Sequence, residues 1–440
     1  MDMILVQVRD SNREIGRAEM PPLGIMYLQA CLKRNHFECD IIDLNLFDNN
    51  LEDDFNLLRV KIKETKCRII GFSSFTQNYY SFKYLCIRLK EEFEDIVVIY
   101  GGCHATFTIR DTMLETPTDI IIKQEGEETI VELLQHYIYN VGEKSCIKGI
   151  AYREGDRIIE TDTRPLLKNL DALPFPDRSS VAIEKYKIPG TVLASRGCVG
   201  KCLFCAAEAM SGGKYRVRSA QNVCEEIAYL NERFGMNEIS FLDNTFTVYK
   251  ERTEKICEEL SKRHIKWDCE SRVDYVDMDL LKTMKLSGCT GIQYGIESGD
   301  DRVLKDIRKA ITVEQIRKLV RETIECGIST VFCGFIIGHP TDTFESINNT
   351  VELAKEMIEL GAKVGIKIST PFPGTQLEKE VRENEFNILT KKWSMYNLMQ
   401  PIYETSEFTG KELYKFYIKK AEELADLQRK GEKTDGFIIN

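Results

Sequence analysis

The stretch GTVLASRGCVGKCLFC at residues 190–205 carries the strongest signal in this chain. It begins as an apolar, β-branched run, which is typical of a buried strand. It continues as a loop with Cys198, Cys202 and Cys205 in the pattern C-x3-C-x2-C. Glycines let that loop bend around one centre, and soft sulfur ligands favour an iron–sulfur cluster, zinc or cuprous ion. We therefore predict a metal centre directly after a strand.

The choice of metal follows from the number of ligands. A structural zinc site usually has four ligands, two of which come from a second cysteine or histidine pair. No histidine lies between Cys198 and His264, and Cys224 lies within a helical pattern, so zinc is disfavoured. A [4Fe–4S] cluster held by three cysteines would leave one iron open to bind a substrate or cofactor.

Strand-like runs followed by helical periods continue after this loop. The runs occupy residues 190–195, 238–242, 266–270, 291–296, 330–336 and 364–370. Six such units predict a partial (β/α)6 barrel over residues 190–385, with its chemistry at the carboxyl ends of the strands. Residues 386–440 are rich in charge and helical in pattern, which predicts a helical C-terminal region.

The N-terminal part shows the same alternation. We predict strands at 4–8, 39–44, 68–73, 97–100 and 119–123, with helices at 24–34, 53–64, 80–92, 110–115 and 127–138. This order is typical of α/β proteins and predicts a doubly wound, Rossmann-like parallel sheet over residues 1–145. A hairpin pattern at 149–161 and an aperiodic, proline-containing stretch at 164–177 predict a hairpin and linker over 146–189.

Small, hydroxyl and acidic residues gather at the predicted strand ends of this first domain. Glycines there let a large ligand approach the backbone, and helix starts favour phosphate or amide groups. Each residue could instead be an ordinary turn or cap. The candidates are Pro22, Leu23, Gly24, Ser73, Ser74, Gly101, Gly102, His104, Glu125, Gly126 and Glu127.

Composition limits the class of protein. The chain has 440 residues, 43% of them hydrophobic and 30% charged, which is typical of a soluble globular protein of two or three domains. Its formal charge of −10 gives no indication of a nucleic-acid partner. No apolar run reaches the ~18 residues of a membrane span, and the start MDMILVQVRD lacks a basic segment and a cleavage signal. We expect a cytoplasmic protein without a membrane span.

The fifteen cysteines are an odd number, which argues against a disulfide framework and favours a reducing compartment. Three of them form the cluster motif. The other twelve are dispersed, and most are expected to be small buried side chains.

The cysteine loop after the first strand of a six-unit barrel resembles the radical S-adenosylmethionine (SAM) superfamily, including the aromatic Phe204 before the last cysteine. The resemblance implies that the open iron binds the amino and carboxylate groups of SAM. The reduced cluster then cleaves SAM to a 5′-deoxyadenosyl radical, which abstracts hydrogen from the substrate.

Further strand-end segments resemble motifs of the same superfamily. They are FLDNTF at 241–246, ESRVD at 270–274, YGIESG at 294–299, GFIIGHP at 334–340 and TPFPGT at 370–375. Each alone is a weak signal, because residues such as Glu297 or Arg272 also form ordinary ion pairs. The SAM-binding residues that the resemblance implies are Phe204, Asp243, Asn244, Arg272, Glu297, Ser298, Gly338 and Pro373.

The first domain, with its P-P-L-G, G-G-x-H-A-T and E-G-E-E-T segments, resembles the cobalamin-binding domain of B12-dependent radical SAM enzymes, the family of C- and P-methylases and of Mg-protoporphyrin ester cyclases. The resemblance implies cobalamin over the strand ends, bound by the candidates given above. Residues 10–16, DSNREIG, contain no histidine, so a lower axial histidine ligand to cobalt is predicted to be absent. His104 is either a cobalt ligand or a structural turn residue.

The two resemblances together imply a cobalamin-dependent radical SAM methyltransferase. It would methylate an unactivated carbon or a phosphinate phosphorus of a small metabolite or natural-product intermediate, through methylcobalamin and the 5′-deoxyadenosyl radical. Such an enzyme would be oxygen-sensitive and would take electrons from a flavodoxin or ferredoxin.

Several alternatives remain open. They are a ring-forming or rearranging enzyme without net methyl transfer, a radical SAM enzyme that has lost cobalamin, a methylthiotransferase, and a non-catalytic cobalamin or cluster sensor. The methylthiotransferase is disfavoured because the cysteines of the N-terminal part are dispersed and the C-terminal part is helical in pattern.

Overall fold

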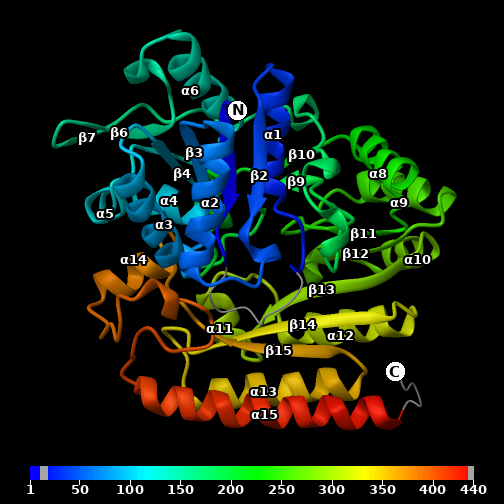
Figure 1. Cartoon of the computed structure of the whole chain (residues 1–440). Coiled ribbons are helices and arrows are strands. Elements are labelled where there is room, and N and C mark those ends of the chain that lie inside the picture. Colours follow the sequence, from blue (N-terminus) through cyan, green and yellow to red (C-terminus); the bar gives the residue numbers. More distant parts are fainter. Residues whose placement is uncertain (10–17, 435–440) are drawn as a thin grey trace. The chain divides into compact units, whose positions relative to one another are not determined.

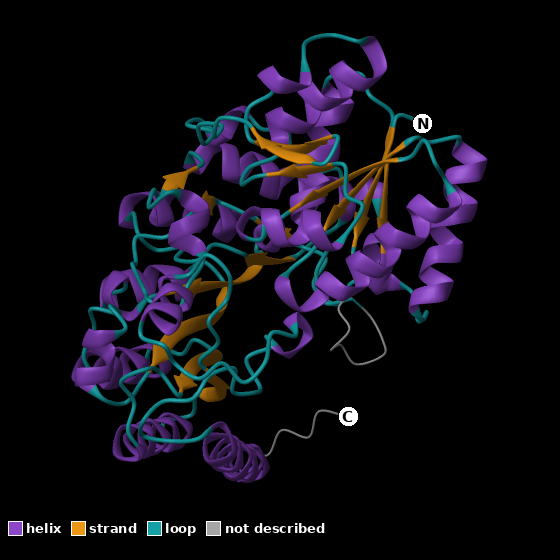
Figure 2. Cartoon of the chain, turned by 90° about the vertical axis from the view of Figure 1, so that its left-hand side faces the viewer, coloured by secondary structure: helices purple, strands orange, loops and turns teal. Residues whose placement is uncertain are grey.

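The computed structural model describes residues 1–9 and 18–434. The chain forms two compact units, Met1–Pro189 and Gly190–Asn440. Each is built on its own sheet with helices packed on it (Figures 1 and 2). In the described residues, no helix is long and apolar enough to cross a membrane.

The first unit contains a seven-stranded sheet in the order β2-β1-β3-β4-β5-β6-β7. Its strands are β1 (Met3–Gln7), β2 (Cys39–Asp43), β3 (Ile69–Ser73), β4 (Val97–Gly101), β5 (Ile120–Ile122), β6 (Ile150–Glu154) and β7 (Arg157–Glu160). The first five are parallel, and the hairpin β6–β7 extends the sheet in antiparallel fashion. The five predicted strands and the predicted hairpin are all present, and the doubly wound fold is confirmed.

The helices of this unit also match their predicted places within a few residues. They are α1 (Leu23–Arg34), α2 (Leu51–Thr65), α3 (Tyr79–Glu92), α4 (Cys103–Phe107), α5 (Ile109–Glu115) and α6 (Glu127–Tyr139). The short helix α4 was not predicted, since a five-residue helix is too short to show a period. It begins at the glycine pair that ends β4.

The second unit contains six parallel strands in chain order, β8-β11-β12-β13-β14-β15. They are β8 (Thr191–Val192), β11 (Glu238–Phe241), β12 (Lys266–Ser271), β13 (Cys289–Glu297), β14 (Thr330–Ile337) and β15 (Lys363–Ile368). The helices between them are α7 (Ala207–Ser211), α8 (Ala220–Phe234), α9 (Lys250–Lys262), α10 (Met278–Leu286), α11 (Asp301–Asp306), α12 (Val313–Glu325), α13 (Phe344–Glu359) and α14 (Gln376–Glu383). This confirms the partial (β/α)6 barrel.

The predicted first barrel strand, 190–195, is wrong in its extent. Only β8 joins the barrel sheet, and β9 (Ser195–Arg196) pairs instead with β10 (Arg216–Val217) in a separate antiparallel ribbon. The physical reason is the buried carboxylate of Asp243, which accepts hydrogen bonds from the Ala194 amide and the Ser195 hydroxyl. These bonds turn the chain out of the sheet just before the cysteines.

Barrel strands alternate between buried and accessible positions. In β12 the side chains of Trp267, Cys269 and Ser271 are buried, whereas those between them are exposed. Strand β14 alternates in the same way. One face of the sheet is therefore buried, and the other carries less buried side chains, such as Asp268 and Glu270 in β12.

The C-terminal region is helical only from Gly410. Helix α15 (Gly410–Thr434) packs alongside α13 and β15, as the lower part of Figure 1 shows. Residues 384–409 are irregular, apart from a 3₁₀ turn at Trp393–Met395 and a bridge between Ile388 and Tyr403. The predicted helix is present over the charged stretch 411–433, whereas residues 384–409 of the predicted helical region bury Tyr396 and Tyr403 in an irregular segment.

Candidate functional site

The cysteine loop is held from several sides at the carboxyl end of the barrel. The amide of Leu203 donates to Ile307 O, and the amide of Leu377 donates to Leu203 O, so segments after β13 and β15 both fix the loop. A Cβ atom at Gly200 would lie 2.8 Å from Arg272 Nη1 and about 3.5 Å from two cysteine sulfurs. A Cβ at this position would require the guanidinium of Arg272 to move.

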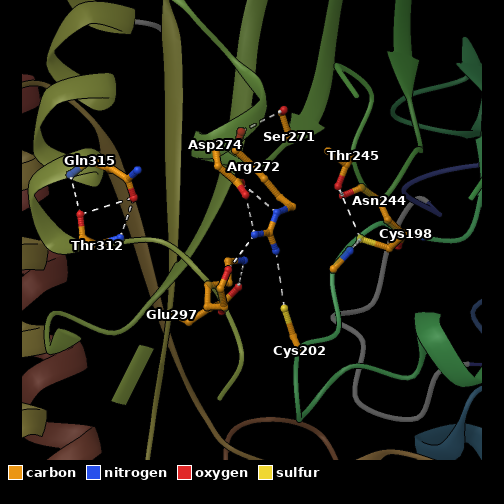
Figure 3. A network of polar contacts seen from close by, with 12 residues as sticks. Cys198, Cys202, Asn244, Thr245, Ser271, Arg272, Asp274, Glu297, Thr312 and Gln315 are labelled. Carbon is orange, nitrogen blue, oxygen red and sulfur yellow. Dashed lines mark hydrogen bonds and ion pairs between the residues drawn. The ribbon is translucent and has the colours of Figure 1, made fainter. Parts of the chain in front are cut away.

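Arg272 is the centre of the polar network (Figure 3). Its Nε and Nη2 each lie 2.9 Å from a carboxylate oxygen of Asp274, in a bidentate pair. Nη2 also donates to Lys309 O at 2.7 Å, and Nη1 lies 3.7 Å from Cys202 Sγ. With the guanidinium fixed on two sides, its remaining donor is directed at a cluster cysteine.

A second buried cation, Lys309, lies beside this network. Its Nζ donates to Glu297 Oε1 at 2.9 Å, and both side chains are at most 10% exposed. Glu297 and the two neighbours of Lys309, Arg308 and Ala310, have φ values of 57° to 71°. Non-glycine residues adopt this left-handed conformation at a cost, and such strain concentrates at functional sites.

Helix α12 fixes the place of that strained loop. Thr312 and Gln315 form a reciprocal capping box at its first turn, three residues after Lys309 (Figure 3). Lys309 was not identified from the sequence, because a lysine beside Arg308 in a loop resembles any solvated charge. No sequence signal marks its burial.

The pKa values of the cysteine thiols depend on their burial and on these two cations. Burial raises the pKa of Cys205 to about 11. Burial also raises the pKa of Cys202, while Lys309 and Arg272 oppose that shift. Metal-bound cysteines are thiolates, so both cations favour the ligand form of Cys202.

The other residues implied for SAM occupy varied positions. Asp243 is buried and holds the end of β8, while Asn244 Nδ2 donates to Gly197 O at 3.1 Å. Ser298 Oγ lies 3.2 Å from Thr350 Oγ1 on α13. Gly338 and Pro373 lie in the loops after β14 and β15. The structure thus brings Arg272 and Glu297 to the cysteine loop, whereas Asp243 and Ser298 bind neighbouring chain segments.

His339, in the loop after β14, belongs to the GFIIGHP segment but was not among the residues implied for SAM. Its imidazole is fully buried, and its ring centroid lies 5.7 Å from that of Phe204 on the cysteine loop. Four steps along the sheet separate β14 from β8. The two rings therefore meet across the open end of the curved sheet.

The loops after β3 and β4 in the first unit are held by small and uncharged groups. Gly102 has φ 99° and ψ −174°, a conformation essentially restricted to glycine. A Cβ there would lie 3.0 Å from Ser74 O and 3.2 Å from Ser73 Oγ. Ser74 Oγ in turn hydrogen-bonds Tyr100 at 2.6 Å. The predicted residues at the ends of β3 and β4 therefore do lie together.

His104 and Glu125 have structural contacts within this unit. The His104 ring is 1% exposed, its Nδ1 lies 3.2 Å from Thr76 Oγ1, and its centroid lies 4.7 Å from that of Tyr79. Burial lowers its pKa to about 3. Glu125 accepts a hydrogen bond from the Leu167 amide. These contacts favour a structural role over cobalt ligation for His104. Residues 10–16 lie outside the described residues.

Comparison with known proteins identifies the family. The family model described as the radical SAM superfamily matches residues 192–354, and the one described as the B12 binding domain matches residues 16–134. An uncharacterized methyltransferase of Pyrococcus horikoshii is 33% identical over 95% of this chain and 90% of its own length. The chain belongs to the cobalamin-binding radical SAM family. The cofactors of the family are SAM, a [4Fe–4S] cluster and cobalamin.

Two further relatives of this radical SAM protein are informative. The anaerobic magnesium-protoporphyrin IX monomethyl ester cyclase of Rubrivivax gelatinosus is 27% identical over 89% of this chain and 72% of its own. The solved structure of the cobalamin-dependent SAM radical enzyme OxsB superposes with a TM-score of 0.77 at 20% identity. It covers 95% of this chain, which spans about two thirds of OxsB (66%). The likeness to OxsB shows a shared fold.

The cysteine loop of this family member fits an iron–sulfur cluster in its chemistry. Three free thiols lie on one loop, with two cations close to one of them. Within residues 1–9 and 18–434, no three His, Cys, Asp or Glu side chains come close enough together to hold a single metal ion. Ligands around a four-iron cluster stand further apart than those around one tetrahedral ion.

In the first unit, a buried side-chain amide with an unpaired oxygen fits cobalamin as a ligand. Asn78, 3% exposed, follows the end of β3, and its Nδ2 donates to Val8 O at the end of β1. Its Oδ1 is buried without a hydrogen-bond partner among the described residues. Cobalamin carries several carboxamide groups, which donate N–H bonds, so an open amide acceptor between two strand ends suits this ligand.

Proposed function

We propose that this protein transfers the methyl group of SAM, by way of cobalamin, to an unactivated carbon or a phosphinate phosphorus of a small molecule. The observation that carries the proposal is the buried network of Arg272, Lys309 and Glu297 beside the cysteine loop, in a chain that also has a cobalamin-type domain. The methyltransferase named for the Pyrococcus relative supports methyl transfer as the reaction. A reduced flavodoxin or ferredoxin is the proposed electron donor.

When bound, the cluster supplies the electron that splits SAM into methionine and a 5′-deoxyadenosyl radical, and cobalamin supplies the methyl carrier. The chain itself supplies position and charge. Arg272 and Lys309 stabilise anionic sulfur at Cys202. The Lys309–Glu297 pair offers opposite charges to the carboxylate and ammonium of an amino acid, and its burial strengthens both interactions.

A second candidate is a ring-forming or rearranging reaction without net methyl transfer. The cyclase relative, which aligns with 89% of this chain, favours it. The two candidates differ in how SAM is consumed. A methyltransferase also produces S-adenosylhomocysteine, whereas a cyclase needs only the radical cleavage to 5′-deoxyadenosine.

The test uses the full chain, purified without oxygen, reconstituted with iron and sulfide, and supplied with cobalamin. After addition of SAM and a chemical reductant, we expect cluster and corrin absorption, one equivalent of S-adenosylhomocysteine per cobalamin, and 5′-deoxyadenosine. With SAM carrying a CD3 group, the corrin fraction should gain that group.

The outcomes separate the candidates. Cluster absorption without corrin bands would remove cobalamin from the proposal. Formation of 5′-deoxyadenosine without S-adenosylhomocysteine would favour the second candidate. Absence of both products under strong reductant would leave a binding protein in place of an enzyme.

A further inference from the structure

Thr245, in the loop after β11, places a buried hydroxyl against the cysteine loop. The residue is 0% exposed, and its Oγ1 lies 3.6 Å from Cys198 Sγ, within hydrogen-bonding distance for a sulfur atom (Figure 3). Its two predecessors in the FLDNTF segment, Asp243 and Asn244, are implied for SAM by the resemblance, whereas Thr245 is not. The contact with a cysteine sulfur therefore needs a separate explanation.

The chain around Thr245 fixes the place of this hydroxyl. The Tyr215 hydroxyl donates to Thr245 O at 2.8 Å, and Asn244 Nδ2 donates to Gly197 O at 3.1 Å. The next residue, Phe246, is fully buried. Because the segment is anchored on both sides, the hydroxyl lies at the cysteine loop without help from a ligand.

The proton of the Thr245 hydroxyl has two acceptors within reach. With a free thiol at Cys198, Thr245 Oγ1 donates to Asn244 O at 2.6 Å. A cysteine that binds iron has lost its proton, so its sulfur only accepts hydrogen bonds. Hydrogen bonds to an ionised acceptor are the stronger ones, and a thiolate at Cys198 therefore favours rotation of the hydroxyl toward the sulfur.

The donors around the cysteine sulfurs differ in kind. Cys198 Sγ also accepts from the Gly200 amide at 3.3 Å, and Cys202 Sγ lies 3.7 Å from the guanidinium of Arg272. One of these donors is backbone and another is a charged side chain. Thr245 is the neutral side chain among the three, so its hydroxyl can be removed without changing a charge or the course of the loop.

Such a hydrogen bond has a consequence for electron transfer. Hydrogen bonds to the sulfurs are among the factors that set the reduction potential of an iron–sulfur cluster. Reduction adds one electron and makes the cluster and its sulfurs more negative. A donor at a sulfur then stabilises the reduced form more than the oxidised form, which raises the potential.

We propose that Thr245 is a positioning residue that raises the reduction potential of the cluster through a hydrogen bond to Cys198. The electron comes from the reduced flavodoxin or ferredoxin proposed above, and no covalent bond forms or breaks. This inference rests on the proposed function, because it requires that Cys198 binds the cluster. It gives Thr245 a part in the electron-transfer step that precedes SAM cleavage.

The test is a redox titration of the reconstituted full-length protein without SAM, followed by the electron paramagnetic resonance signal of the reduced cluster. Thr245→Val removes the hydroxyl at similar side-chain volume. We expect the equilibrium constant for one-electron reduction to fall about tenfold, which corresponds to a potential lower by about 59 mV. Thr245→Ser retains the hydroxyl and should restore most of the native potential.

A second measurement reports on the iron–sulfur bonds themselves. Because a hydrogen bond withdraws electron density from the sulfur, its loss in Thr245→Val should raise the iron–cysteine stretching frequency in the resonance Raman spectrum. Thr247→Val is the matched control, since it removes another buried hydroxyl of the same loop, which hydrogen-bonds Ser271. It should leave both the potential and the frequency unchanged. Iron content and the thermal unfolding midpoint verify that each variant holds an intact cluster.

The outcomes separate this inference from the proposed function. Equal potentials and frequencies in Thr245→Val and the native protein, both with intact clusters, would overturn the inference and leave the proposed function standing. A shift in Thr245→Ser as large as that in Thr245→Val would also overturn it, because packing would then be the cause. Should Thr245→Val fail to hold a cluster, Thr245→Ala removes the same hydroxyl and is titrated in its place. A native protein that assembles no cluster would overturn the proposed function, and this inference with it.

Discussion

The two units place loops at the carboxyl ends of parallel strands, but they hold those loops by different means. In the barrel, the loops are joined by buried charges, with Arg272 paired to Asp274 and Lys309 paired to Glu297. In the first unit, the loops after β3 and β4 are joined by close backbone approach at Gly102 and by the hydroxyls of Ser74 and Tyr100, and the one buried ion pair described at a strand end there, Arg9 with Asp54, follows β1.

This difference matches the two kinds of ligand. A cluster with thiolate ligands, and a zwitterionic cofactor beside it, require fixed counter-charges away from water. A large ligand with many neutral amide groups requires backbone proximity and hydrogen-bond partners, and fixed charges would only add a desolvation cost. We therefore expect substitutions in the barrel to affect charge chemistry, and substitutions in the first unit to affect ligand fit.

The largest effect should come from the cluster ligands. Cys202→Ala removes one of three sulfurs and should abolish both cluster assembly and 5′-deoxyadenosine formation, while cobalamin binding to the first unit persists. Iron content, visible absorption and product analysis measure this. Cys326→Ser, at a partly exposed cysteine of the same unit, is the matched control and should retain the cluster. Loss of cobalamin binding in Cys202→Ala would contradict the separation of the two sites.

The next largest effect should come from Lys309→Met. It leaves Glu297 buried without its counter-charge, and breaking a buried ion pair costs about 3–5 kcal/mol. We expect the free energy of unfolding of the cluster-free protein to fall by that amount, measured by denaturant titration. Lys305→Met, at an exposed position on α11, should change it by less than about 0.5 kcal/mol.

The double variant Lys309→Met/Glu297→Gln sharpens this result. Because the unpaired carboxylate is then absent, most of the lost stability should return, although SAM binding should stay impaired. A double variant as unstable as the single one would show that packing of the lysine stem, and not the ion pair, is what stabilises this part of the barrel.

In the first unit, Gly102→Ala should have a smaller effect. Its backbone conformation disfavours alanine, and the added Cβ would press on Ser74 O, so we expect a loss of about 1–3 kcal/mol and weaker cobalamin binding. Gly142→Ala is the control, since Gly142 also has a positive φ of 75° but no atom within 4 Å of the new Cβ. Equal losses of cobalamin affinity in both variants would argue against a role for the Gly102 contact.

The sequence predicted the fold of the first unit well because its central parallel strands, buried on both faces, appear as continuous apolar runs between helical periods. The cysteine loop was equally clear as a pattern, since its three cysteines lie within eight residues, and their role as cluster ligands stays a prediction. Residues 384–409 were not predicted correctly. This segment carries few charges and is irregular because it buries Tyr396 and Tyr403, a tertiary effect that local pattern does not contain.

The parts of the site that were missed depend on contacts between distant segments. Lys309 becomes a buried cation only because a left-handed turn brings it to Glu297. His339 becomes a buried imidazole only because the loop after β14 meets Phe204 across the end of the sheet. Residue type does not distinguish Lys309 from an ordinary loop lysine, whereas His339 lies within the GFIIGHP segment, whose resemblance to a superfamily motif did mark this loop.

The smallest effect concerns the amide oxygen of Asn78 in the first unit, which has no hydrogen-bond partner among the described residues. Asn78→Leu keeps the approximate volume but removes the acceptor Oδ1 and the Nδ2 bond to Val8 O. We expect the dissociation constant for cobalamin to rise about tenfold, as for one lost hydrogen bond.

Asn45→Leu removes another amide donor to the same Val8 carbonyl, at 3.4 Å, and so controls for loss of that bond. If the two variants weaken cobalamin binding equally, the Val8 carbonyl is the part that matters and Oδ1 does not contact the ligand. If only Asn78→Leu weakens cobalamin binding, the first unit recognises its ligand through an uncharged acceptor. This agrees with the ends of β3 and β4, where the described residues form no buried ion pair.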